Sequence, residues 1–373
     1  MTRTIRVFAN MLGLTLTMTG CGSTDSNTAQ KMTITRTASV QSVFTPTDLE
    51  KTVNSLVTEI NKATPTSMQL NVILKVLSAY FQPVLIGANR ATSELQTTGG
   101  TNAPADADLD AATADQITMV DDVINQSTKG IGIAPFNTDV VPSINAAVAA
   151  GIPVVTIDSD LSDSNRDLYI GTMNGAAGTT AGNTLLGLLP AAPGTVVLLG
   201  QGDNSWPDGY KRTNGAKDVL VAAGYTVTVV TVQWSGTADL DTLGNLLSTS
   251  DPPVVGMMGM FSNAFECAQA AESAGKTADS IAIVAFDFDP KTVAYMRTGF
   301  IKATHAQRQY YMDYLTPYVL YGMNILGKEK TKSLLSAQMI DQYEFNTGLD
   351  VVAASQLDAY SAFQDQLGIG SSN

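Results

Sequence analysis

The amino-acid sequence predicts an α/β protein built from two doubly wound lobes, each a parallel β-sheet covered by helices on both faces. Short apolar runs bounded by turn residues alternate with stretches of helical character from about residue 70 onward. The runs are apolar throughout, which is typical of strands buried on both faces of a parallel sheet. One sheet holding all of these strands would be unusually wide, and 373 residues are ample for two lobes.

Composition and charge exclude several classes of function. The chain has 21 Lys and Arg residues against 34 Asp and Glu residues, a formal net charge of −13. Such a field repels phosphate backbones, which excludes nucleic-acid binding by a general basic surface. The only histidine is His305 and the only cysteines are Cys21 and Cys267, too few for a multi-histidine zinc site, a CxxC redox pair or a disulfide framework. We therefore expect no metal ion and no cofactor.

The first 21 residues have the features of a bacterial export signal. Arg3 and Arg6 precede a mostly apolar stretch at residues 7–18, which is too short to span a bilayer as a helix. Met-Thr-Gly-Cys follows at 18–21 and resembles the lipobox of bacterial lipoproteins. The resemblance implies a signal peptide at 1–20 and acylation of Cys21, hence a protein on the extracytoplasmic side of a bacterial membrane. An ordinary secretory signal with an incidental cysteine is the alternative.

Residues 21–68 are expected to form a tether and one short helix. Ser, Thr, Asn and Gln dominate residues 22–46 without an apolar period, which predicts a flexible linker. Apolar residues then recur at helical spacing over 48–62, so a short helix is expected before the first strand.

Strands and helices alternate along the remainder of the chain. Strands are expected at 70–76, 130–134, 152–157, 168–171, 195–199, 226–232, 254–260, 281–286, 299–304 and 349–353. Helices are expected at 82–95, 110–128, 139–150, 175–189, 209–223, 238–248, 263–274, 290–297 and 310–326. This order is that of repeated βαβ units.

A polar loop after the strand at 152–157 is the first candidate for a binding site. It carries Asp158, Asp160 and Arg166. Open α/β sheets bind their ligands beyond the carboxyl ends of parallel strands, which is where this loop lies. Asp160 and Arg166 can equally pair with each other across the loop. The residues alone thus predict a two-lobed α/β binding or enzyme domain.

The segment AGIPVVTIDSD at 150–160 also resembles the periplasmic sugar-binding proteins of ABC transporters, specifically the ribose-binding-like group that shares its fold with LacI-type ligand domains. Scattered blocks extend the resemblance from about residue 70 to residue 360. It implies two lobes joined by three crossovers, with a sugar held between them. The implied N-terminal lobe comprises 69–173 and 307–340, the C-terminal lobe 174–306 and 341–362, and the tail 363–373.

The resemblance also implies which residues contact the sugar. They are Tyr80, Phe81, Asp158, Asp160, Arg212, Trp234, Asn263, Asp287 and Gln307. Planar polar groups fix hydroxyls in pairs, whereas aromatic rings suit the C–H faces of a sugar. Several of these residues have a structural alternative. Tyr80 and Phe81 can cap the core, Asp158 and Asn263 can cap a helix or turn, and Arg212 and Trp234 can be a plain surface residue and hydrophobic filling, respectively. A pentose, a hexose, a polyol and a quorum-signalling furanose all remain open as ligands.

The function that this resemblance implies is that of a monomeric solute-binding lipoprotein, not an enzyme, that delivers a monosaccharide or small polyol to a membrane-embedded ABC permease. A sugar touching both lobes would stabilise their closed arrangement. The alternative is a sensor that presents the closed form to a chemoreceptor or histidine kinase. A glycosidase using Asp158 and Asp287 as its carboxylate pair is less favoured. A LacI-type repressor is disfavoured because an export segment, not a helix-turn-helix, precedes the lobes.

Overall fold

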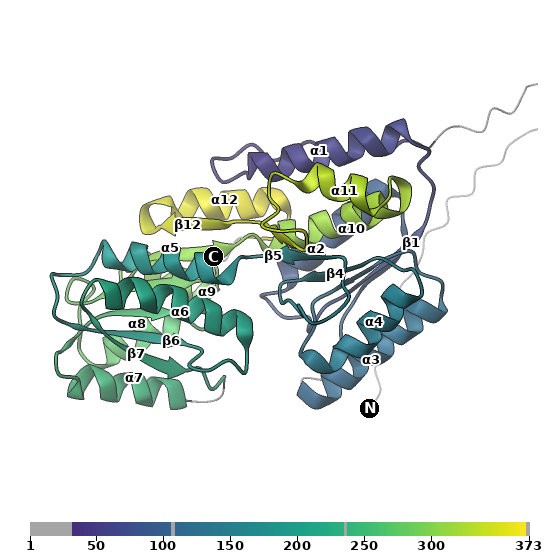
Figure 1. Ribbon diagram of the computed structural model, residues 1–373. Coiled ribbons are helices and arrows are strands. Elements are labelled where there is room, and N and C mark those ends of the chain that lie inside the picture. Colours follow the sequence, from purple (N-terminus) through teal and green to yellow (C-terminus); the bar gives the residue numbers. More distant parts are fainter. Residues whose placement is uncertain (1–31, 106–108, 235–236, 371–373) are drawn as a thin grey trace, which may run out of the picture. The chain divides into compact units, whose positions relative to one another are not determined.

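The computed structural model describes residues 32–105, 109–234 and 237–370, and these build two six-stranded sheets (Figure 1). The first sheet has the strand order β11-β5-β4-β3-β1-β2, and the second β12-β10-β9-β8-β6-β7. Within each sheet the strands pair in parallel, except that β12 runs antiparallel to β10. The predicted fold class, two α/β lobes with parallel sheets, is confirmed.

Of the twelve strands in the described residues, ten coincide with the predicted apolar runs, whereas β2 and β11 were not predicted. In the first sheet they are β1 (Gln69–Ile73), β2 (Thr98–Asn102), β3 (Ile131–Ile133), β4 (Val154–Ile157), β5 (Leu168–Gly171) and β11 (Glu344–Asn346). In the second they are β6 (Thr195–Gly200), β7 (Thr226–Thr231), β8 (Val254–Gly259), β9 (Ala282–Phe286), β10 (Ile301–Gln307) and β12 (Leu349–Ala353). β4, β6 and β9 are buried along their whole length, as expected for central parallel strands.

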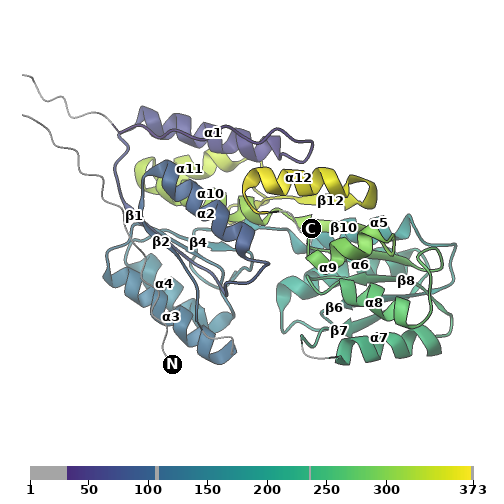
Figure 2. The same ribbon diagram turned by 180° about the vertical axis from the view of Figure 1, so that it is seen from behind.

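Helices cover both faces of the first sheet. They are α1 (Thr47–Lys62), α2 (Gln82–Leu95), α3 (Leu109–Asn125), α4 (Val141–Ala149), α10 (Gln309–Ile325) and α11 (Lys328–Leu335). Figures 1 and 2 show α2 and α10 on one face with α1 and α11 outside them, and α3 and α4 on the opposite face.

Helices also cover both faces of the second sheet. They are α5 (Asn174–Leu186), α6 (Pro207–Ala222), α7 (Ala238–Thr249), α8 (Phe265–Ser273), α9 (Pro290–Arg297) and α12 (Leu357–Leu367). α5 packs against α6, whereas α8 packs against both α7 and α9. Of the described residues, none forms a helix that is both long and apolar enough to cross a bilayer.

The chain crosses between the two lobes three times. The crossings lie between β5 and α5, between β10 and α10, and between β11 and β12. The third crossing falls between Asn346 and Leu349, so β11 belongs to the first lobe although residues 341–362 are predicted in the second. α12 likewise runs through Leu367 and takes in the start of the predicted tail.

An N-terminal strap, residues 32–46, replaces much of the flexible linker that the composition predicts. Ile34 in it is only 2% exposed, and Phe44 packs edge-on against the Tyr360 ring at 4.9 Å between centroids. The predicted signal peptide, Cys21 and the rest of the predicted tether lie outside the described residues.

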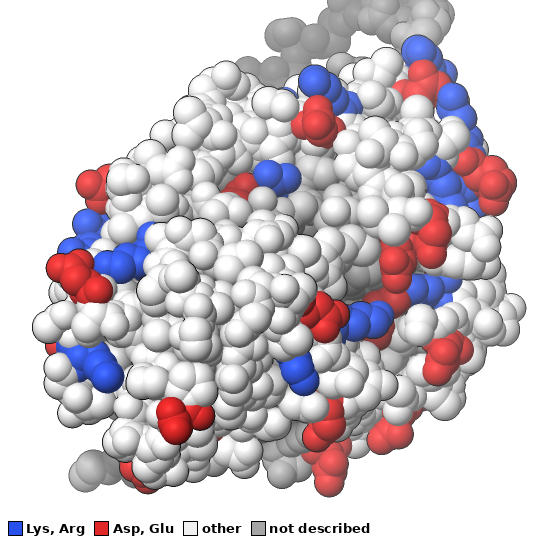
Figure 3. Space-filling model, turned by 60° about the vertical axis from the view of Figure 1, so that its left-hand side comes forward, with Lys and Arg blue, Asp and Glu red and all other residues white. Residues whose placement is uncertain are grey.

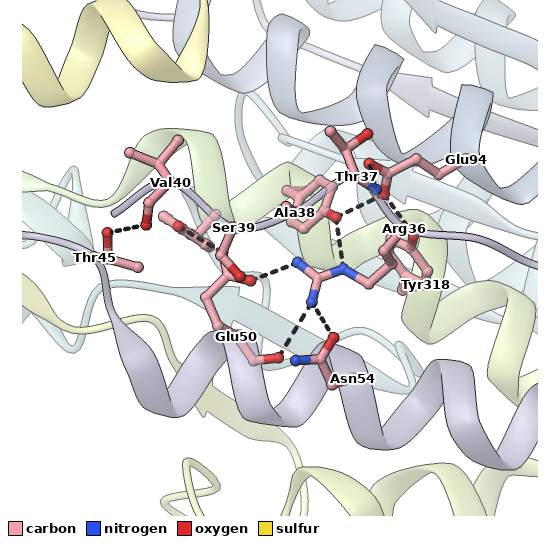
Figure 4. Close-up of polar contacts among 12 residues, drawn as sticks. Arg36, Thr37, Ala38, Ser39, Val40, Thr45, Glu50, Asn54, Glu94 and Tyr318 are labelled. Carbon is pink, nitrogen blue, oxygen red and sulfur yellow. Dashed lines mark hydrogen bonds and ion pairs between the residues drawn. The ribbon is translucent and has the colours of Figure 1, made fainter. Parts of the chain in front are cut away.

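A buried polar network fastens the strap to the first lobe (Figure 4). The guanidinium of Arg36 pairs with Glu50 of α1 at 2.5 Å and donates from Nε to the Tyr314 hydroxyl at 2.9 Å. The hydroxyls of Tyr314 and Tyr318 in turn donate to Glu94 of α2, at 2.7 and 2.6 Å. The polar strap residues thus have specific partners, which composition alone does not reveal.

Candidate functional site

A cavity of about 260 Å³ lies beyond the carboxyl ends of strands from both sheets. It is lined by Lys75, Val76, Tyr80, Phe81, Asp158, Ser159, Asn174, Trp206, Asp208, Gly209, Arg212, Trp234, Phe261, Ser262, Asp287 and Gln307. The lining therefore comes from loops far apart in the chain, and both lobes supply polar and aromatic side chains to it.

Most of the predicted ligand-binding residues line this cavity. These are Tyr80, Phe81, Asp158, Arg212, Trp234, Asp287 and Gln307. Asp160 and Asn263 are the two predicted residues that the described cavity lining does not include.

The carboxylate of Asp160 is engaged elsewhere. Arg166, which is 5% exposed, binds both of its oxygens through Nε and Nη2, and the Thr156 hydroxyl donates to Oδ1 at 2.8 Å. A buried arginine needs such a partner, and Asp160 supplies it. The pairing across the loop, which the sequence left open, is thus the arrangement that the structure contains.

Asn263 lies in the turn that enters α8. Its Nδ2 donates to Oε2 of Glu266 at 3.2 Å, and its backbone oxygen accepts from the Glu266 N–H at 3.0 Å. The side-chain oxygen of Asn263 is buried without a hydrogen-bond partner and the N-cap of α8 is Ala264, so Asn263 does not act as the helix cap that the sequence allowed.

Asp158 and Asp287 occupy equivalent places in the two lobes. Asp158 directly follows β4 and Asp287 directly follows β9, and each of these strands is third in its sheet order. Both residues have left-handed backbones, with φ of 62° and 63°. Non-glycine residues adopt this conformation at a cost and concentrate at functional sites. The same strained turn in both lobes aims each carboxylate toward the cavity.

A hydrogen-bonded chain links these two aspartates. The ammonium of Lys75 lies 3.0 Å from Oδ2 of Asp158, and the Tyr80 hydroxyl donates to Oδ1 at 2.7 Å. Gln307 Nε2 donates to the Tyr80 oxygen at 3.0 Å and to Oδ1 of Asp287 at 2.9 Å. The chain fixes donors and acceptors from both lobes in one orientation.

Arg212 enters the cavity from the side of α6. Its Nε donates to Asn174 Oδ1 at 2.9 Å and its Nη1 to the Met260 oxygen at 2.8 Å, while the guanidinium lies 4.7 Å from the Phe286 ring centroid. Gly178 of α5 permits this position, because a Cβ there would lie 1.9 Å from the Arg212 carbonyl oxygen. The arginine is 5% exposed, so the surface alternative does not hold.

Burial governs the charge state of the carboxyl groups. It raises the pKa of Asp287 to about 6, although Arg212 and the Gln307 amide act in the opposite direction. Burial also raises the pKa of Asp208, and the nearby Lys75 ammonium counteracts this in part. Asp287 can therefore accept or donate a hydrogen bond near neutral pH.

Three aromatic rings form one wall of the cavity. Trp206 and Phe261 stack with centroids 4.6 Å apart and planes 12° apart, and Trp234 lies 5.5 Å from Phe261. Trp234 is 56% exposed and has φ of 57°, neither of which suits a residue that merely fills the core.

The sequence reasoning missed Lys75 and Trp206. Lys75 lies two residues after the end of β1, and its place beyond the carboxyl end of a parallel strand could have marked it as a binding-site candidate. Trp206 precedes Pro207, the first residue of α6, in a loop that carries no predicted site residue. Asp208, Phe261 and Ser262 line the cavity as well.

On the face drawn in Figure 3, charged residues are dispersed. On that face, Lys and Arg are interspersed with Asp and Glu among uncharged residues, and neither sign forms a continuous patch.

His305 is buried in β10 between the Ala285 oxygen and the Thr184 hydroxyl, both at 2.9 Å, and burial lowers its pKa to about 4. The imidazole is therefore neutral near neutral pH, and both of its ring nitrogens are engaged within the fold.

Comparison with protein families and known sequences adds to this geometry. A family model described as a periplasmic binding protein domain matches residues 71–329, well over half of the chain. No curated protein matches the chain.

Solved structures share the fold. A sugar ABC transporter sugar-binding protein from Bacillus halodurans is 24% identical with a TM-score of 0.66, covering 79% of this chain and 100% of that one. A solute-binding protein from Burkholderia graminis in complex with D-arabinose is 25% identical with a TM-score of 0.63, covering 78% and 96%. An arabinose-binding protein from Geobacillus stearothermophilus has the same identity and TM-score, covering 78% and 98%.

Proposed function

Because this chain belongs to the periplasmic binding protein family, whose members are extracytoplasmic solute binders and not enzymes, we propose that its cavity captures a monosaccharide or a related small polyol. The observation that carries the proposal is the convergence of Asp158, Arg212, Trp234 and Asp287 from both lobes on one cavity. The sequence alone would equally have allowed these side chains to lie apart on the surface.

The chemistry of the lining suits a polyhydroxylated ligand. Carboxylates of Asp158 and Asp287 accept hydrogen bonds, and the cations of Lys75 and Arg212 donate them. The stacked wall that includes Trp206 offers flat apolar faces to C–H groups. A wrong epimer would leave buried polar groups unpaired, at a cost of roughly 1–3 kcal/mol each. That cost is the basis of discrimination between sugars.

The size of the cavity supports a small ligand. About 260 Å³ lies just below the range of roughly 300–1,000 Å³ in which drug-sized ligands bind. The bound sugars named for the similar structures, such as D-arabinose in the Burkholderia graminis protein, are of this class.

The sugar-loaded protein then delivers its ligand to an ABC-type permease. Contacts with both lobes give the sugar a higher affinity for the closed arrangement, which is the differential affinity that a population shift requires. Loss of labelled-sugar uptake on deletion of the gene is the expected result. If the deletion leaves sugar uptake unchanged but abolishes sugar-dependent transcription, the protein is instead a sensor.

Calorimetry tests the binding site. We expect a panel of D-ribose, D-xylose, L-arabinose, D-glucose, D-galactose and D-allose to contain a ligand, and Asp158→Ala and Asp287→Ala to abolish its binding. Asp218→Asn, on the exposed side of α6, serves as the control that keeps affinity. Equal affinity in the two alanine variants and the wild type would refute the assignment.

A further inference from the structure

A second cavity of about 260 Å³ adjoins the proposed sugar cavity. Tyr80, Ser262 and Asp287 line both, so the two spaces meet at these side chains. Tyr80 and Asp287 are also joined to each other through Gln307, which holds the boundary between the two cavities in a fixed geometry.

Apart from Tyr80, Ser262 and Asp287, the residues that line the second cavity do not line the first. Gln82 and Pro83 belong to the start of α2, Phe288 to the loop after β9, and Gln364 to α12. Ile369, just beyond α12, closes a further side. The start of α2, the loop after β9, Gln309 at the β10–α10 crossing and the C-terminal helix thus line a space next to the sugar cavity.

The residues that line the second cavity suit a neutral, hydroxylated group. The amides of Gln82, Gln309 and Gln364 can each donate and accept, and Phe288 and Pro83 offer apolar faces. Among the described lining residues the only charged groups are the carboxyls of Asp287 and Asp289, with no lysine or arginine. A phosphorylated or carboxylated group would meet no cation there.

We propose that this second cavity is a subsite for the second ring of a neutral disaccharide whose first ring occupies the cavity of Asp158 and Arg212. The inference rests on the proposed sugar-binding function. Each cavity alone falls just short of the roughly 300–1,000 Å³ of drug-sized sites, whereas the pair together lies within that range. The glycosidic bond crosses at the shared boundary beside Tyr80 and Asp287.

Paired calorimetric titrations test the subsite. The probes are D-glucose against cellobiose and maltose, D-galactose against β-1,4-galactobiose, D-xylose against xylobiose, and L-arabinose against α-1,5-arabinobiose. We expect at least one disaccharide to bind about tenfold or more tightly than its monosaccharide. Monosaccharides that bind as well as or better than every partner disaccharide would overturn the subsite and leave the proposed function intact. Binding of no sugar of either kind would overturn the proposed function itself.

Substitutions in the second cavity test whether it is the source of the disaccharide preference. Gln364→Ala should weaken the preferred disaccharide by about 3- to 10-fold while monosaccharide affinity stays unchanged, because one hydrogen-bonding partner is lost. Ile369→Trp should abolish the disaccharide preference by filling the cavity. Gln366→Ala is the matched control, since this exposed glutamine lies on the same helix and outside the described lining. An unchanged disaccharide-to-monosaccharide affinity ratio in both Gln364→Ala and Ile369→Trp, with native thermal melting, would refute the proposal.

Discussion

Asp287 combines a strained backbone with a perturbed carboxyl group. Its φ of 63° and its buried position follow from the turn after β9, and burial raises its pKa to about 6. The sequence indicated the residue because it ends an apolar run, as Asp158 does. Its charge state could not be predicted, because that depends on Arg212 and Gln307, which only the folded chain brings near.

The contribution of Asp287 to the stability of the unliganded protein should fall as the pH rises from about 4 to about 6, whereas that of His305, whose pKa burial lowers to about 4, should rise over the same range. In this range the folded state retains a proton on Asp287 that the unfolded state, with its ordinary lower pKa, releases. Asp287→Asn removes the Asp287 titration, so the free energy of unfolding of this variant should rise more steeply with pH over the same range than that of the wild type. Chemical denaturation of both proteins at several pH values measures the difference, and parallel pH profiles would contradict the assigned pKa.

Trp234 should contribute more to binding than to stability. The residue is 56% exposed, so Trp234→Ala removes little buried surface but takes away a flat face of the cavity wall. We expect the affinity for the sugar identified in the panel to fall by about tenfold, near 1.4 kcal/mol, with the melting temperature of the free protein almost unchanged. Reduced melting temperature with intact affinity would instead assign the ring to the core.

Among the elements, apolar strands were predictable and polar ones were not. β4 and β9 follow directly from their apolar runs, whereas β2 has the sequence TGGTN and was missed. β2 is an edge strand held by pairing with β1, and a Cβ at Gly99 would lie 1.9 Å from the Leu70 oxygen. This close approach requires glycine, and it arises from the packing of β2 against β1, which the local sequence does not reveal. The strap at 32–46 was missed for the same reason, since its polar residues find partners on distant helices.

Removal of Arg36 should release the strap. The ion pair with Glu50 is nearly buried, with side chains 8% and 10% exposed, and breaking such a pair costs about 3–5 kcal/mol. Arg36→Ala should therefore lower the free energy of unfolding by that order and raise hydrogen exchange over 32–46. Lys51→Ala breaks an exposed pair with Asp48 and should cost only about 0–1 kcal/mol. Equal losses in the two variants would argue against a fastening role for Arg36.

For the whole molecule, the two-lobe organisation was predictable because the pattern of βαβ units repeats along the chain. The cavity was predictable in part, since residues after strand ends converge at the edges of parallel sheets. Asp160 shows the limit of that reasoning: it follows a strand too, yet Arg166 engages its carboxylate. Which of two neighbouring carboxylates is free to bind a ligand depends on the packing of the loop, which the local sequence pattern does not reveal.

Sugar binding should stabilise and compact the whole protein. At a hundred times its Kd, a ligand that binds only the folded state adds about 2.7 kcal/mol to the free energy of unfolding. We expect a higher melting temperature and a smaller radius of gyration by X-ray scattering with sugar, and neither change in Asp287→Ala. A rise in melting temperature without compaction would count against closure of the lobes.

The strap also affects the greatest distance that an anchored form of this protein can reach from a membrane. If Cys21 carries the expected lipid, only residues 22–31 separate the acylated cysteine from the fastened part of the chain. About ten residues reach at most roughly 35 Å even at full extension. With that lipid attached, the first lobe, to which the strap is fastened, would stay within this distance of the bilayer, where the mouth of a permease would also open.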